Sequence, residues 1–208
     1  MASQYSVFTI EPEIIKVIHK YVFDYTYEIC ANLKKTDKGT LVPHNVLKGK
    51  LEEYSPGKWR GTCSHQEYSS NIIHTHPLSS YAYPSTDDIM KVIKNYGKIV
   101  NSLVGTKWGI WVVSNTTSSN IYSKSQESVL ASKIKKYLDR IGFCTKTTDK
   151  ERETSDDKSK VLMSEDYVLI AKTIKTLSDL LMVKIELHSW DDIMTTGLEV
   201  KGLTEYEE

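Results

Sequence analysis

Residues 70–97 contain a strand, a loop and a helix in direct succession, and this order constrains the fold more than any other feature. Ser70–His76 carries the isoleucine and threonine typical of strands. Prolines at both ends of Pro77–Pro84 discourage a helix or a central strand there, so we expect a loop. Ser85 is a favourable N-cap for a helix whose apolar residues recur every three or four positions until Gly97. The segment therefore predicts a sheet with a helix packed beside it.

Helix-like and strand-like segments alternate irregularly along the rest of the chain. Periodicity and turn signals predict helices over residues 11–23, 126–141 and 164–181, and strands over 27–34, 41–46, 59–63, 108–113, 120–122 and 183–190. The turn signal at residues 36–39 joins the strands over 27–34 and 41–46 into a hairpin. Gly142 is expected to end the helix over 126–141. This pattern favours a mixed α and β fold of about three layers over a regularly wound parallel sheet.

The length of 208 residues suits one elaborated domain, residues 1–208, because a typical domain holds about 150 residues. Residues 145–160 contain almost no apolar side chain, so we expect a mobile loop there. Residues 164–190 then add a helix and a strand, and the acidic tail at 198–208 is expected to be frayed.

Charge and cysteine content exclude several kinds of partner. Lys plus Arg and Asp plus Glu each number 27, so no net field draws the chain toward nucleic acid or an anionic membrane. The three cysteines are too few for a disulfide framework and show no CxxC spacing, which indicates a reducing compartment. The chain has neither a basic start followed by an apolar core nor a run of about 20 apolar residues. We therefore expect a soluble cytoplasmic protein that binds neither nucleic acid nor membranes.

His74 and His76 are two positions apart in the predicted strand, so their side chains point to the same face. Two imidazoles on one face can hold a single metal ion, although two packed or surface histidines would give the same pattern. Asp88 occupies the third position of the helix that Ser85 begins, which places its carboxylate at the helix mouth. Two imidazoles and one carboxylate leave a fourth position open on Zn²⁺, as in catalytic zinc sites. The SxxD pattern is also common as a helix cap alone.

These residues together resemble the JAMM (MPN+) metalloprotease family, which includes deubiquitinating isopeptidases. The family pattern is a glutamate at the start of a strand, then HxHP, a loop and SxxD; here it matches Glu28, His74-Thr75-His76-Pro77 and Ser85-Thr86-Asp87-Asp88. The order of helices and strands extends the resemblance over residues 5–142. It implies an α/β fold, a mixed α+β three-layer sandwich with a cytidine-deaminase-like core.

The resemblance implies a zinc metallopeptidase that hydrolyses amide or isopeptide bonds. His74, His76 and Asp88 would bind Zn²⁺, which lowers the pKa of a bound water toward 7. Glu28 would be the general base for that water and would later protonate the departing amine. The Ser85 hydroxyl would help to stabilise the oxyanion of the tetrahedral intermediate.

The loop before the SxxD motif departs from the family pattern. Eight residues, 77–84, separate the second histidine from Ser85, whereas the family has seven. Asp87 as the ligand would restore the usual spacing but would leave Pro84 in the serine position. We favour Asp88, because it keeps the SxxD motif and because loops accommodate insertions easily. Asp87 stays open as the alternative.

Ubiquitin or ubiquitin-like conjugates are the substrates that the resemblance implies. Such a substrate would be held as an added strand, and the segments around Asn71 and Trp59 are the candidate edges. A catalytically inactive scaffold of the same fold and a peptidase with a non-ubiquitin substrate are the competing hypotheses.

The remaining cysteines and histidines receive no catalytic role. Cys30, Cys63 and Cys144 are expected to be small buried apolar residues rather than nucleophiles. The isolated histidines are expected to lie at the surface or to cap helices; they are His19, His44, His65 and His188. Cys63 and His65 are close enough in sequence to the motif to be alternative site residues.

Overall fold

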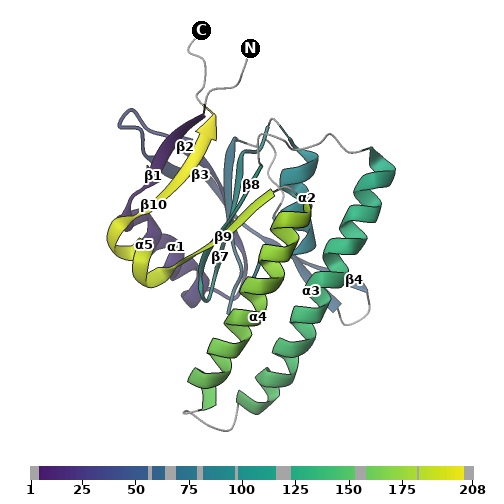
Figure 1. Ribbon diagram of the computed structural model, residues 1–208. Coiled ribbons are helices and arrows are strands. Elements are labelled where there is room, and N and C mark those ends of the chain that lie inside the picture. Colours follow the sequence, from purple (N-terminus) through teal and green to yellow (C-terminus); the bar gives the residue numbers. More distant parts are fainter. Residues whose placement is uncertain are drawn as a thin grey trace.

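A six-stranded sheet forms the centre of the computed structural model, in the order β3-β2-β6-β7-β8-β9 (Figure 1). The structure describes residues 5–55, 58–63, 69–78, 82–96, 98–115, 123–152, 158–181 and 183–203. The strands of the central sheet are β2 (Ile29–Lys35), β3 (Leu41–Lys48), β6 (Asn71–Thr75), β7 (Asn101–Thr106), β8 (Gly109–Asn115) and β9 (Val183–Ser189). Within this sheet β6 and β7 are parallel, and the other neighbouring pairs are antiparallel.

Helices cover both faces of the sheet (Figure 1). One face packs against two helices and a two-stranded ribbon: α1 (Pro12–Asp24), α5 (Trp190–Thr196), β1 (Tyr5–Ile10) and β10 (Leu198–Leu203). The other face packs against α2 (Thr86–Lys94), α3 (Lys124–Arg152) and α4 (Lys158–Leu181). A separate hairpin, formed by β4 (Lys50–Ser55) and β5 (Lys58–Thr62), follows β3. The predicted mixed α and β class is therefore confirmed.

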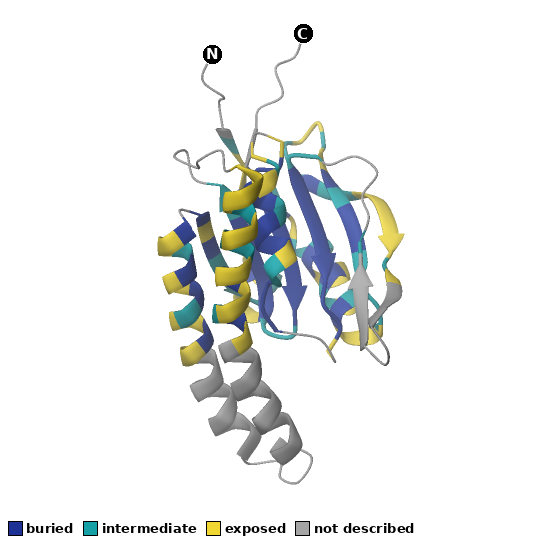
Figure 2. Ribbon diagram, turned by 90° about the vertical axis from the view of Figure 1, so that its right-hand side faces the viewer, coloured by how far each residue is buried: buried dark blue, intermediate teal, exposed yellow. Residues whose placement is uncertain are grey.

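Alternating side chains of the central strands supply two separate cores. Ile72 of β6 and Val104 of β7 pack with α2, α3 and α4. Their neighbours Ile73 and Leu103 pack with α1, α5 and the β1–β10 ribbon. Every residue of β6 and β7 is buried, and Figure 2 shows buried strands behind helices whose outer sides are exposed. A polar side chain on β6 therefore lies inside the protein, where it needs a partner.

The parallel pair β6 and β7 is connected through α2, which makes this part of the chain a βαβ unit. In such units the carboxyl end of the first strand lies beside the start of the helix that follows it. The HxHP and SxxD segments occupy these two places, since β6 ends at Thr75 and α2 begins at Thr86.

The predicted loop over residues 145–160 is wrong. α3 passes through Gly142 and continues to Arg152, and α4 already begins at Lys158, while residues 153–157 lie outside the described residues. Lysine, arginine and glutamate are good helix formers, and a helix that has already formed extends without a new nucleation step. A lack of apolar residues therefore does not distinguish an extended helix from a loop.

Within the described part of the chain, no helix is both long and apolar enough to span a bilayer.

The predicted frayed tail is wrong for residues 198–203, which form β10. This strand pairs antiparallel with β1, from Tyr5 opposite Leu203 to Ile10 opposite Leu198. The pattern also missed β4, β7 and α5, whereas α1 and the β2–β3 hairpin lie where they were expected. The strand expected at 120–122 and the last residues, 204–208, lie outside the described residues.

Gly197, between α5 and β10, and Gly39, between β2 and β3, both have a left-handed backbone, so their alanine variants can be compared. Their φ angles are +80° and +78°. A Cβ on Gly197 would lie 2.6 Å from the carbonyl oxygen of Ile10, whereas a Cβ on Gly39 would meet nothing within 4 Å. Gly197→Ala should therefore lower the free energy of unfolding by about 3 kcal/mol, and Gly39→Ala by about 1 kcal/mol, in denaturant titrations. Equal losses in the two variants would contradict this close approach of the two backbones.

Candidate metal centre

The strand β6 brings two imidazoles to one buried place. His74 and His76 are 3% and 4% exposed, and their Nε2 atoms are 3.3 Å apart. His76 lies one residue beyond β6, but its N–H donates to the carbonyl oxygen of Gly105 at 2.7 Å, which continues the pairing with β7. The extended backbone therefore directs both rings to the same side, as the HxH spacing predicts.

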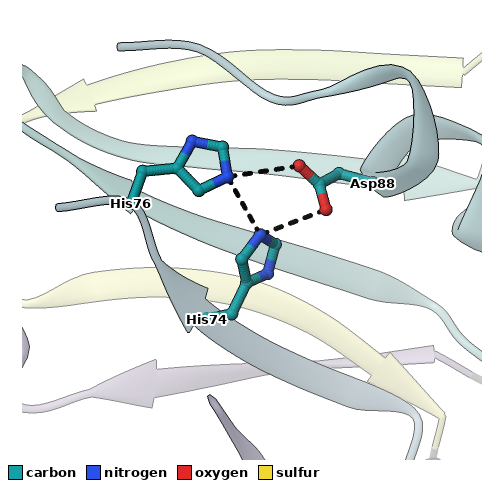
Figure 3. A group of neighbouring side chains, drawn as sticks. All are labelled: His74, His76 and Asp88. Carbon is teal, nitrogen blue, oxygen red and sulfur yellow. Dashed lines mark hydrogen bonds and ion pairs between the residues drawn. The ribbon is translucent and has the colours of Figure 1, made fainter. Parts of the chain in front are cut away.

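The first turn of α2 brings a carboxylate to the same place. Ser85 is the N-cap: its backbone N–H donates to Asp88 Oδ2 at 2.7 Å, and its Oγ accepts from the Asp88 N–H at 3.2 Å. This capping box fixes Asp88, whose side chain points at the histidines (Figure 3). Asp88 is buried, whereas Asp87 is exposed and is not part of the group. Asp88 is thus the carboxylate that the structure places with the two imidazoles.

His74, His76 and Asp88 form a buried group that can bind a metal ion. His74 Nε2 lies 3.1 Å from Asp88 Oδ1, and His76 Nε2 lies 3.5 Å from Asp88 Oδ2. Three ligands of a tetrahedral ion, each about 2.0–2.1 Å from the metal, are about 3.4 Å from one another. The 3.3 Å between the two Nε2 atoms and the 3.1 Å from His74 Nε2 to Asp88 Oδ1 are close to this spacing, while His76 Nε2 lies 3.5 Å from the other carboxylate oxygen.

The charge state of Asp88 also suits a metal ligand. Burial alone would raise the pKa of the Asp88 carboxyl, but the charges and hydrogen bonds of His74 and His76 outweigh burial and hold that pKa well below its usual value. The carboxyl group is therefore ionised at neutral pH. An ionised carboxylate is the form that binds a cation, and a buried one requires a positive partner.

Glu28 directly precedes β2, the strand next to the histidines. Cys30 of β2 pairs with His74 of β6, and continuing this antiparallel register by two residues places Glu28 opposite His76, on the same face. Two backbone hydrogen bonds hold this end of β2: Ile29 N–H donates to Thr75 Oγ1 at 3.0 Å, and Gly49 N–H donates to the Glu28 carbonyl at 2.8 Å. The Glu28 side chain is half-buried, which leaves it open to water from one side.

Cys63 adds a sulfur to this site, and the expectation of cysteines without a disulfide is wrong for Cys30 and Cys63. Cys30 and Cys63 are joined by a disulfide, with their Cα atoms 5.9 Å apart. Cys63 is half-buried and its Sγ lies 3.5 Å from Glu28 Oε2, so it is neither the isolated nor the fully buried residue that was expected. No local pattern signals this placement, because Cys30 and Cys63 are 33 residues apart in the sequence.

The other predicted residues do not join the centre. His19 packs between Phe23 and Trp190, His44 is exposed on β3, and His188 lies on β9. His65 and the side chains of Trp59 and Cys144 lie outside the described part of the structure. Asn71 does not provide a free edge, because β6 lies between β2 and β7.

The sequence analysis also missed the part played by Thr75. The side chain of Thr75 points away from the metal group, yet its Oγ1 accepts from the N–H of Ile29, directly after Glu28. No sequence pattern signals this hydrogen bond, because it depends on how β2 and β6 are paired.

Comparison of the chain with protein-family models, with curated proteins and with solved structures found no match.

Replacing one imidazole should empty the centre. His74→Ala leaves one imidazole and one carboxylate, and we expect bound divalent metal to fall more than about ten-fold in elemental analysis of purified protein. His44→Ala removes an exposed histidine of β3 and should leave the metal content unchanged. Stoichiometric metal in the His74→Ala protein would mean that the ligands lie elsewhere.

Proposed function

We propose that this chain is a zinc-dependent metallopeptidase of the JAMM type, which hydrolyses amide or isopeptide bonds. The observation that carries the proposal is the buried triangle of His74, His76 and Asp88, with a glutamate directly before the adjacent strand. Two imidazoles and one carboxylate form a donor set that suits Zn²⁺, and three protein ligands leave a position for water. When bound, the ion would supply an acidified water and polarise the scissile carbonyl.

Glu28 serves as the proton carrier in this proposal. The register of β2 and β6, continued by two residues, places it opposite His76, and its half-buried side chain is within reach of water. It takes the proton from the attacking water and delivers it to the departing amine. No covalent link between enzyme and substrate is required, so this mechanism needs no cysteine nucleophile.

Ser85 has two tasks in this proposal. Its hydroxyl donates to Asp88 Oδ2 at 2.7 Å, and its backbone N–H donates to the same oxygen at the same distance. Since the backbone bond persists when the hydroxyl rotates, Ser85 can turn its single hydroxyl proton toward an oxyanion without releasing Asp88. An oxyanion donor of this kind contributes on the order of 3 kcal/mol to transition-state stabilisation.

The strand arrangement supports a substrate with an extended tail, and we propose ubiquitin or ubiquitin-like conjugates. The hairpin of β4 and β5 pairs with no further strand among the described residues, so each of its strands has one edge without a partner there. Cys63 follows β5 directly and lies beside Glu28, so this hairpin reaches the centre. An extended tail that adds to the β5 edge would bring its last peptide bond to the metal group.

A scaffold without metal is the second candidate. The observation that favours it is that Asp88 is already paired with both histidines and with Ser85. Zinc analysis separates the two candidates, because a scaffold would be purified without metal.

Glu28→Gln tests the catalytic role directly. The wild-type protein should cleave at least one linkage in a panel of di-ubiquitins, and the variant should be slower by about 10²–10⁴-fold while it keeps one zinc per chain. Glu13→Gln, in the exposed first turn of α1, is the matched control and should retain activity. Full activity of Glu28→Gln would refute the role of Glu28 as the general base. Bound zinc with every linkage intact would instead refute ubiquitin as the substrate.

Thr75 provides a second test, since it positions Glu28 without contacting substrate. Thr75→Val keeps the shape of the side chain but removes the Oγ1 that accepts from the Ile29 N–H. We expect kcat to fall about ten-fold with zinc content unchanged, because a small displacement of a catalytic group is costly. Thr75→Ser restores the acceptor and should restore kcat. If the valine and serine variants behave alike, the hydrogen bond does not position Glu28.

A further inference from the structure

The disulfide between Cys30 and Cys63 lies at the wall of the metal centre. Cys30 is 1% exposed and pairs across β2 and β6 with His74. Cys63 is half-buried and directly follows β5. The bond therefore ties the end of the β4–β5 hairpin to β2, which directly follows Glu28, and Cys63 is the more exposed of the two cysteines.

The redox state of this pair determines what Cys63 offers to Glu28. Cys63 Sγ lies 3.5 Å from Glu28 Oε2, within hydrogen-bond reach for sulfur. A disulfide sulfur has no proton, so in the bonded form the carboxylate keeps its lone pairs for water. A Cys63 thiol can donate its proton to Oε2 and thereby occupy the acceptor that a general base needs.

The bond also fixes the surroundings of Glu28 from one side. On the other side, Thr75 holds the backbone of Ile29, and the Glu28 carbonyl accepts from Gly49. Breaking the disulfide would release the Cys63 end of the hairpin and leave β2 attached to β6 and the metal ligands. Loss of the bond should therefore affect catalysis and not metal binding.

We propose that Cys63 is a thiol-exchange site through which a small thiol of the glutathione class regulates the hydrolase, with the disulfide form active and the dithiol form slow. This inference rests on the proposed function. Cys63, the residue that would be modified, is not one of the five motif residues.

The reaction balances as a thiol–disulfide exchange. A glutathione thiolate attacks Cys63 Sγ, the Cys30–Cys63 bond breaks, and Cys30 leaves as a thiolate that takes up a proton. A second glutathione thiolate then attacks the glutathione sulfur on Cys63 and releases glutathione disulfide and the Cys63 thiolate, which takes up the second proton. Two glutathiones are oxidised and one protein disulfide is reduced; glutathione disulfide drives the reverse reaction.

The experiment uses the zinc-loaded full chain, equilibrated in glutathione buffers that range from oxidised to reduced. Alkylation and mass spectrometry give the disulfide fraction of Cys30 and Cys63, and hydrolysis of the cleaved di-ubiquitin gives kcat in the same samples. We expect kcat to fall about ten-fold from the oxidised to the reduced end, with the same midpoint as the disulfide fraction. Zinc content should be constant throughout.

Three variants sharpen the result. Cys63→Ser cannot form the bond and keeps a hydroxyl donor near Glu28, so it should be slow in every buffer. Cys30→Ser leaves the Cys63 thiol free and should behave in the same way, although its buried position makes the first variant the safer one. Cys144→Ser retains both cysteines of the pair and should respond as the wild type does.

Each outcome decides the proposal. Equal kcat in both redox states, or a pair that stays reduced in every buffer, would overturn the regulation and leave the proposed hydrolase intact. Full activity of Cys63→Ser would overturn it as well. Absence of hydrolysis in both redox states, with zinc bound, would refute the proposed deubiquitinase activity and, with it, the redox regulation of that activity.

Discussion

The ionised carboxylate of Asp88 lies inside the protein, and its pairing with His74 and His76 is the interaction on which the site depends. A buried charge is unfavourable unless positive or hydrogen-bonding groups surround it. The βαβ unit supplies those groups from two elements, with the imidazoles on β6 and the carboxylate on α2. The capping box of Ser85 fixes the carboxylate, so the cap that begins α2 also positions a candidate ligand.

The rest of the fold keeps this unit in place. Both faces of β6 and β7 are covered, so the strands cannot move without disturbing two cores. Gly105 permits close packing here, since a Cβ on it would lie 3.3 Å from side chains of Ile18 and Val22. Its carbonyl also accepts from the His76 N–H, so the same residue sets the distance to α1 and the position of a candidate ligand.

The sequence predicted the features that depend on neighbouring residues and missed those that depend on residues distant in the chain. His74, His76 and Asp88 came from local rules, namely the strand period and the helix cap, and the structure brings them together. The ends of α3 and α4 were missed because the charged residues that suggest a loop are also good helix formers. β10 and the Cys30–Cys63 bond were missed because they depend on partners distant in sequence, β1 and the residue after β5. Such pairings have no local signature.

X-ray absorption at the zinc edge of the purified protein tests the central claim most directly, because it reports the atoms bound to the ion. The account predicts nitrogen and oxygen neighbours at about 2.0–2.1 Å, with the multiple scattering of imidazole rings and no sulfur. A sulfur neighbour at about 2.3 Å would mean that a cysteine binds the ion, and a protein without zinc would mean that the triangle is a salt-bridged cluster. Either result would contradict a centre made of His74, His76 and Asp88.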